Sequence, residues 1–234
     1  SIGLDMREGW GMTETAGIGT AFYSREIKKG CVGRAVDGSE VQIAKDGEIL
    51  FRGPGVFCGY LNKPEQTNET IIDGWLYTGD VGHLDNSGNL KITDRKKDII
   101  ITAGGKNISP SEIENELKFS AFISDAVVIG DKRKFLSCLI MIDEENVMKF
   151  AQDHDVPFSN FESLCKSKEI IDLIEVEVNQ VNKKFANVEQ VKKFTLIDVQ
   201  LTAEDDELTP TMKLKRKFIN QKYTNIIEAM YKTA

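Results

Sequence analysis

Residue types that build metal centres, disulfide frameworks and catalytic triads are scarce in this sequence. Its 234 residues include only two histidines and four cysteines, and no two cysteines form a Cys-x-x-Cys pair. This argues against a zinc site and a disulfide framework, and leaves little material for a His-based metal site or a Ser-His-Asp triad. Such cysteine usage is typical of a reducing compartment, so we expect a cytoplasmic protein.

Long apolar runs and an excess of basic residues are also missing. No run approaches the roughly 18 apolar residues of a membrane span, so we expect no transmembrane segment, while peripheral contact with a membrane stays open. Thirty Lys and Arg stand against 37 Asp and Glu, a net charge of −7 that argues against nucleic-acid binding. The first residues do not form a signal peptide, and a first residue other than Met indicates that an N-terminal part is missing.

Residues 1–96 are rich in strand and turn signals. Asp46-Gly47 lies between the apolar segments 41–43 and 48–51 and predicts a β-hairpin. A further strand at 90–93 is expected to pair with residues 82–84. The charged cluster at 94–98 marks a change of composition, and we place a domain boundary between residues 96 and 97.

Residues 97–234 show alternating signals for strands and helices. Ser109 and Glu112 flank Pro110 in the pattern of a capping box, which predicts a helix over 110–119. Strands are expected at 126–129, 135–142 and 194–199, and further helices at 168–185 and 216–231. The buried stripe of the helix at 168–185 is expected to comprise Ile171, Ile174, Val178, Val181 and Phe185. This pattern indicates a small α+β domain.

Two segments of the first region carry residues suited to a nucleotide. The segment Gly9-Trp10-Gly11-Met12-Thr13-Glu14 combines glycines for close backbone approach, an aromatic face for a base, a hydroxyl for a phosphate and a carboxylate for Mg²⁺. In Thr78-Gly79-Asp80, a carboxylate after a turn can bind a vicinal diol. Taken singly, the first is more often a Gly-rich turn with a buried Trp, and the second a hairpin turn with an exposed Asp.

Two later segments contain basic residues and glycines. Arg95 provides a fork of donors, and Gly104-Gly105 is interpreted as a flexible turn that could line a channel. A P-loop is excluded because Asn107 follows Lys106. The basic residues around Lys213 could deliver a lysine to a phosphate. The plain alternatives are a charged linker with a helix cap, and a solvated helix face.

The order and spacing of these four segments resemble the C-terminal part of the AMP-forming acyl-CoA synthetases, in the superfamily of adenylate-forming enzymes. Residues 47–65 also resemble a segment of that family, and residues 93–98 and 208–216 look most like its long-chain fatty acyl branch. The resemblance implies an α+β fold. Residues 1–96 would form the β-rich end of the large nucleotide-binding domain, and residues 97–234 a mobile C-terminal α+β domain.

The resemblance also implies roles for single residues. The nucleotide-binding set would be Trp10, Gly11, Met12, Thr13, Asp80, Arg95 and Lys213. In that set Trp10 would pack on adenine, where most relatives have Tyr. Asp80 and Arg95 would hold the ribose hydroxyls. Lys213, Thr13 and Glu14 would be catalytic: Lys213 drives adenylation, Thr13 contacts the α-phosphate, and Glu14 coordinates Mg²⁺.

The remaining implied roles concern the second half-reaction and the hinge. Lys97 would be the hinge between domains, and Gly104, Gly105 and Lys106 would contact coenzyme A, with either glycine bordering the pantetheine tunnel. Met212 stands where the commoner family ending has glycine. Lys215 is therefore a rival for the role of Lys213.

The activity implied is that of a long-chain fatty acid–CoA ligase. Such an enzyme uses ATP, Mg²⁺ and coenzyme A to convert a fatty acid into acyl-CoA through an acyl-adenylate, releasing pyrophosphate and AMP. The sequence contains no Ser/Thr/Gly-rich phosphate loop, so we expect a fragment that is inactive without the missing N-terminal part. The alternatives are an adenylating enzyme that loads a separate carrier protein and a non-catalytic homologue that acts as a binding module. The joint presence of Glu14, Asp80, Arg95 and Lys213 favours the enzyme.

Overall fold

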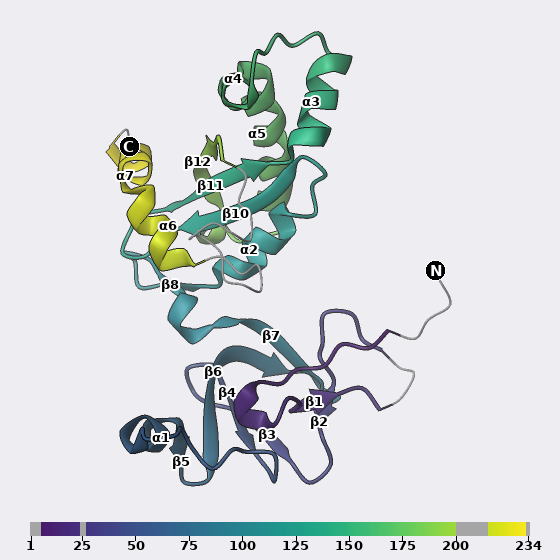
Figure 1. Ribbon diagram of the computed structural model, residues 1–234, viewed down its shortest axis with the longest axis vertical. Coiled ribbons are helices and arrows are strands. Elements are labelled where there is room, and N and C mark those ends of the chain that lie inside the picture. Colours follow the sequence, from purple (N-terminus) through teal and green to yellow (C-terminus); the bar gives the residue numbers. More distant parts are fainter. Residues whose placement is uncertain (1–5, 24–26, 200–214, 233–234) are drawn as a thin grey trace. The chain divides into compact units, whose positions relative to one another are not determined.

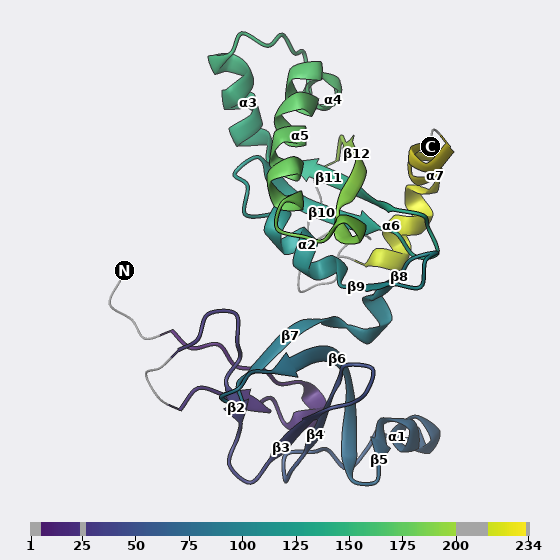
Figure 2. The same cartoon turned by 180° about the vertical axis from the view of Figure 1, so that it is seen from behind.

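A computed structural model describes residues 6–23, 27–199 and 215–232 (Figures 1 and 2). It divides the chain into two compact units, Ser1–Lys97 and Asp98–Ala234. The boundary expected from the sequence lies one residue earlier. None of the helices in the described ranges is long and apolar enough to span a membrane.

An antiparallel sheet of five strands organises the first unit. Its strands are β3 (Glu40–Ile43), β4 (Glu48–Arg52), β5 (Ile71–Ile72), β6 (Trp75–Leu84) and β7 (Leu90–Arg95). The order is β3-β4-β6-β5, and β7 also pairs with β6. The hairpin predicted around Asp46-Gly47 is confirmed, as is the pairing of residues 82–84 with the strand that begins at Leu90.

Among its described residues, the first unit has four further short elements. They are η1 (Thr13–Thr15), β1 (Thr20–Ala21), β2 (Arg34–Ala35) and α1 (Pro64–Thr70), of which β1 and β2 pair in a sheet of their own. The core cluster contains Trp10, Ile49, Phe51, Leu76 and Leu90. The helix α1 has no buried residue and therefore no apolar periodicity, which is why the sequence did not predict it.

The second unit is built on a three-stranded sheet in the order β10-β11-β12. Its strands are β10 (Ile123–Ile129), β11 (Leu136–Ile142) and β12 (Val191–Ile197); β10 runs antiparallel and β12 parallel to β11. Every residue of the central strand β11 is buried. Cys138, Ile140 and Ile142 pack into one core cluster and Leu139 and Met141 into another, as the alternation of side chains across a strand requires.

Helices cover both faces of this sheet (Figures 1 and 2). The helices α2 (Pro110–Leu117), α3 (Glu144–Asp153), α4 (Phe161–Lys166) and α5 (Lys168–Asn182) contribute to the first cluster. The helices α6 (Arg216–Lys222) and α7 (Thr224–Lys232) contribute to the second. The short elements are η2 (Lys96–Asp98), the hairpin strands β8 (Ile100–Ile101) and β9 (Asn107–Ile108), and η3 (Asn187–Glu189). The α+β fold expected from the sequence is confirmed.

Two details of the sequence-based helices are wrong. The predicted helix over 110–119 exists as Pro110–Leu117, but within the described residues the Ser109 side chain makes no capping hydrogen bond. On α5 the buried residue of the first turn is Ile170, whereas Ile171 is 38% exposed. Periodicity fits either isoleucine, and Ile170 is the one that lies in the core cluster of this unit.

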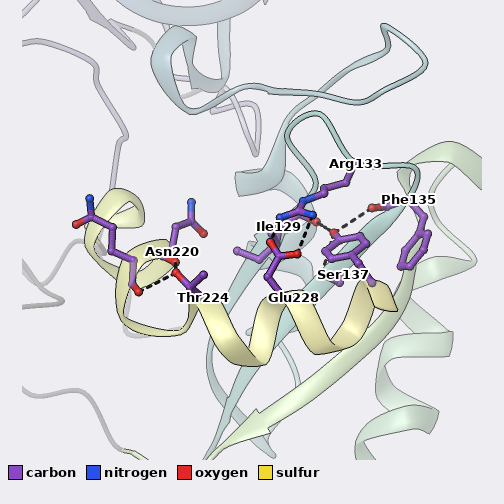
Figure 3. A network of polar contacts seen from close by, with 9 residues as sticks. Ile129, Arg133, Phe135, Ser137, Asn220, Thr224 and Glu228 are labelled. Carbon is purple, nitrogen blue, oxygen red and sulfur yellow. Dashed lines mark hydrogen bonds and ion pairs between the residues drawn. The ribbon is translucent and has the colours of Figure 1, made fainter. Parts of the chain in front are cut away.

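The last predicted helix is two helices. The backbone at Tyr223, φ −100° and ψ 19°, leaves the helical region and separates α6 from α7. The hydroxyl of Thr224 lies 2.7 Å from the carbonyl oxygen of Asn220 and 2.8 Å from that of Gln221 (Figure 3). Such bonding from Thr to a preceding turn competes with the helical ladder and bends the chain.

Candidate functional site

The Gly-rich segment that begins at Gly9 folds back on itself. Trp10 pairs with Thr20 in an isolated bridge, and Thr13–Thr15 forms the short helix η1. A Cβ atom on Gly11 would lie 2.2 Å from the carbonyl oxygen of Gly17. Gly11 is therefore required by the close approach of two backbone segments, and in the turn that follows Thr13 is exposed and Glu14 half-buried.

The indole of Trp10 is buried in the core of the first unit. The residue is 6% exposed, and its ring meets Phe51 edge-on at 6.0 Å between centroids. The indole Nε1 donates a hydrogen bond to Asp80 Oδ2 at 2.8 Å. This is the burial that the plain interpretation predicted, and packing of Trp10 on adenine stays a prediction.

Asp80 and Arg95 lie opposite each other on β6 and β7. Arg95 Nε is 3.1 Å from Asp80 Oδ1, so the two carboxylate oxygens receive one contact from the guanidinium and one from the indole of Trp10. The Asp80 side chain is 9% exposed and that of Arg95 52% exposed. The plain interpretation of an exposed Asp in a hairpin turn is therefore wrong. The arrangement places a fixed carboxylate beside a solvent-accessible guanidinium, which suits a diol that donates to the carboxylate.

Glu14 is held by a tyrosine that the sequence analysis did not single out. The Tyr60 hydroxyl donates to Glu14 Oε1 at 2.7 Å, and the Phe57 amide donates to the Glu14 carbonyl at 3.0 Å. Burial, followed by the hydrogen bond to Glu14, raises the pKa of Tyr60, which therefore remains a donor at neutral pH. Tyr60 lies in the 47–65 segment, where the family resemblance is the only signal that could have indicated it.

The surroundings of Glu14 fit a nucleotide-bound metal better than a protein cage. In the described ranges, no three His, Cys, Asp or Glu residues gather to hold a metal ion. Mg²⁺ is commonly held by one or two carboxylates together with substrate phosphates. A single oriented carboxylate at Glu14, with Thr13 exposed beside it, meets that requirement.

A buried carboxylate, also missed by the sequence analysis, connects this site to the end of the first unit. The Glu48 side chain is 5% exposed. Its Oε1 accepts from the Gly79 amide at 2.9 Å, and its Oε2 from Lys96 Nζ at 2.7 Å. Lys96 also pairs with Asp46 Oδ2 at 2.8 Å, and the hydrogen bonds to Asp46 and then Glu48 raise the pKa of Lys96. Glu48 thus bonds to both Gly79, which precedes Asp80, and Lys96, which follows Arg95.

Replacing Lys96 by methionine is expected to destabilise the first unit by about 1–3 kcal/mol, because Glu48 would keep a buried charge without its cation. Both tryptophans of the chain, Trp10 and Trp75, lie in this unit, so their fluorescence during urea unfolding reports on it alone. The adjacent exposed Lys97, replaced in the same way, is the control. Equal midpoints for the two variants would show that the pair with Glu48 adds nothing.

The residues implied to contact coenzyme A form the tip of the β8–β9 hairpin. The Gly105 amide donates to the Thr102 carbonyl at 2.8 Å, and the Lys106 amide to Thr102 Oγ1 at 3.2 Å. These two hydrogen bonds close the turn on Thr102, and its flexibility stays a prediction. Gly105 has φ +75°, which favours glycine, whereas a Cβ on Gly104 would meet nothing closer than Thr102 Oγ1 at 3.9 Å. Gly104 is not required by the backbone.

The structure describes three of the other predicted site residues and not the fourth. Met12 is half-buried against the core of the first unit, and Lys97 is exposed in η2. Lys213 lies outside the described residues. Its rival Lys215 is exposed at the start of α6, where its carbonyl accepts from the amides of Phe218 and Ile219. In the first unit the structure thus brings Trp10, Asp80 and Arg95 together.

Comparison with known proteins identifies a family for this chain. The AMP-binding enzyme C-terminal domain matches residues 97–234, more than half of the chain. The long-chain-fatty-acid–CoA ligase FadD15 of Mycobacterium bovis is 41% identical over 230 residues, which cover 98% of this chain and 38% of that protein. The chain thus spans well under half the length of this curated relative.

Solved structures agree with this assignment. The o-succinylbenzoate–CoA synthetase MenE of Bacillus subtilis, in complex with its acyl-adenylate intermediate, matches 93% of this chain and 41% of its own, with a TM-score of 0.70 and 26% identity. The same enzyme in complex with ATP and magnesium matches 90% of this chain and 40% of its own, with a TM-score of 0.65 and 28% identity. The chain therefore belongs to the adenylate-forming AMP-binding enzymes, corresponds to their C-terminal part and is similar to long-chain-fatty-acid–CoA ligases among them.

Proposed function

We propose that this chain is the C-terminal region of an AMP-forming long-chain fatty acid–CoA ligase. The observation that carries the proposal is the pair formed by Asp80 and Arg95, a buried carboxylate fixed by an indole and a guanidinium on adjacent strands. Its support is the similarity to FadD15 over almost the whole chain. The substrates would be a fatty acid, ATP and coenzyme A.

In the adenylating half-reaction, this chain would supply binding and electrostatic stabilisation. Asp80 and Arg95 would hold the ribose hydroxyls, and Thr13 the α-phosphate. Lys213 would approach the α-phosphate oxygens, where negative charge develops as the fatty carboxylate attacks and pyrophosphate leaves. A bound Mg²⁺ would neutralise phosphate charge, and Glu14, oriented by Tyr60, is the side chain that would hold it.

In the second half-reaction the lysine has to leave and a long thiol has to enter. Rotation of the C-terminal domain about Lys97 would exchange Lys213 for the hairpin of Gly104 and Gly105. Gly104 has room for a close approach, since a Cβ atom there would have no neighbour closer than Thr102 Oγ1 at 3.9 Å. Coenzyme A would then attack the acyl carbonyl and release AMP.

The experiment that tests this function is ATP–pyrophosphate exchange by the longer protein, with acids from short to long and with or without coenzyme A. Exchange with a long-chain acid and a thioester on adding coenzyme A are expected. Acyl transfer to an isolated carrier protein, but not to coenzyme A, would favour the carrier-loading alternative. Exchange with no acid would favour a non-catalytic homologue.

The 234-residue chain by itself is expected to produce no acyl-CoA above background. It spans 38% of the length of FadD15 and carries no Ser/Thr/Gly-rich phosphate loop for the pyrophosphate end of ATP. The measurement is thioester formation by the purified chain with ATP, Mg²⁺, palmitate and coenzyme A, beside the longer protein as the positive control. Turnover by the chain would contradict the expected dependence on further residues of a longer protein.

A further inference from the structure

Side chains of the C-terminal helix α7 bond to the turn that joins β10 to β11 (Figure 3). The guanidinium of Arg133, in that turn, forms a two-point ion pair with Glu228 of α7: Nη1 is 3.3 Å from Oε2, and Nη2 bonds Oε1. The same guanidinium lies over the ring of Tyr231, with Cζ 4.7 Å from the ring centroid. A two-point pair combined with stacking fixes the plane of an arginine side chain.

Tyr231 holds the same turn at both of its ends. Its hydroxyl lies 3.1 Å from the carbonyl oxygens of Ile129 and Phe135, which flank the turn, and it accepts a hydrogen bond from Ser137 at 3.0 Å. Tyr231 is half-buried, and this burial raises the pKa of Tyr231, so its hydroxyl stays protonated as a donor. Tyr231 therefore connects α7 to both ends of the turn.

The β10–β11 turn also forms hydrogen bonds with the β8–β9 hairpin, which carries Gly104 and Gly105. The carbonyl of Arg133 accepts from the Ala103 amide at 2.8 Å, directly before Gly104. The Lys132 amide donates to the Ile101 carbonyl at 2.8 Å, and the Ile101 amide donates to Asp131 Oδ1 at 3.3 Å. Three hydrogen bonds thus dock β8 and the hairpin tip on residues 131–133, and Arg133 belongs to both sets of contacts.

We propose that Arg133 is a positioning residue for thioester formation. It fixes the Gly104–Gly105 hairpin to α7 and thereby sets the path along which the pantetheine arm reaches the acyl-adenylate. The inference rests on the proposed ligase function. Arg133 touches no substrate in this account, and the adenylating step does not use the hairpin. Loss of the Arg133–Glu228 pair therefore acts on one half-reaction only.

The test uses the longer ligase with Arg133→Met. Because reaction rates are sensitive to displacements of about 1 Å, thioester formation from preformed acyl-adenylate is expected to fall roughly tenfold, with ATP–pyrophosphate exchange within about twofold of wild type. Lys166→Met is the matched control, since it breaks an exposed ion pair with Glu162 in the same unit, away from the hairpin. The exchanged pair Arg133→Glu with Glu228→Arg is expected to recover at least part of the lost rate.

Amide hydrogen exchange gives a second readout that does not depend on activity. In Arg133→Met, exchange of the Ala103 amide is expected to rise about fivefold or more, while amides of β11 stay protected. Equal losses in both half-reactions, or unchanged thioester formation, would overturn the proposal. A wild-type protein that forms no adenylate would instead overturn the ligase function. The exchange measurement would still decide whether Arg133 holds the hairpin, and an unchanged Ala103 amide would refute that.

Discussion

Replacing Lys213 by alanine is expected to slow adenylate formation by the longer ligase roughly 100- to 1,000-fold. A preorganised cation acts most strongly where negative charge develops, and here that charge appears on the α-phosphate oxygens as the bond to pyrophosphate breaks. Thioester formation from a supplied acyl-adenylate does not need that cation and is expected to stay within about threefold of wild type. Pre-steady-state measurement of each half-reaction separates the two rates.

Lys215 offers a matched control for this experiment, because it is a lysine two positions away. Its side chain is exposed, and its structural contribution at the start of α6 comes from the backbone carbonyl, which alanine retains. Lys215→Ala is therefore expected to fold and to form the adenylate at close to the wild-type rate. The reverse pattern, a severe loss in Lys215→Ala and a mild one in Lys213→Ala, would assign the adenylation role to Lys215.

Gly104→Leu is expected to slow thioester formation by about 100-fold and to leave adenylation unchanged. The hairpin has room for the Cβ atom, since its nearest neighbour would be Thr102 Oγ1 at 3.9 Å, so stability should change by no more than about 0.5 kcal/mol. A leucine side chain beside the path of the pantetheine arm would block the thiol without disturbing the fold. Both half-reactions and the urea midpoint are the measurements.

The neighbouring glycine gives the contrasting variant. Gly105 has φ +75°, so Gly105→Ala is expected to strain the hairpin turn at a cost of about 1 kcal/mol, although no atom would clash with the new Cβ. Gly105→Ala thus tests the backbone conformation of the hairpin turn, and Gly104→Leu tests the open space beside the turn. Normal acyl transfer by Gly104→Leu would remove the hairpin tip from the coenzyme A path.

Local signals predicted much of the fold. The Asp-Gly turn at 46–47 carries its own conformational preference, and the apolar strand β11 is buried on both faces, so each could be recognised from neighbouring residues. The helix α1 buries nothing, and the break at Tyr223 comes from side-chain bonding of Thr224 to the preceding turn. The α1 segment has no apolar period, and the buried positions Ile219, Tyr223, Ile227 and Met230 keep a helical spacing through the break, so hydrophobic patterning indicated neither feature.

In the candidate site, too, the sequence indicated single residues but not the contacts between distant segments. Asp80 and Arg95 were indicated by the family resemblance, but their contact across β6 and β7 and the donation from Trp10 depend on pairing between distant segments. Glu48 and Lys96 were missed because each looks like an ordinary surface charge until the sheet places them 2.7 Å apart. Tyr60 was missed as a partner of Glu14, 46 residues away, for the same reason.

The position of Arg95 on β7 has a consequence for the order of synthesis. Chains emerge from the ribosome N-terminus first, and domains generally fold as units as they emerge. The partner of Asp80 and the cation of Glu48 both belong to the last residues of the first unit, which ends at Lys97. A nascent chain that stops before residue 95 therefore holds two buried carboxylates without their cations. The first unit is electrostatically complete only as synthesis of the second begins.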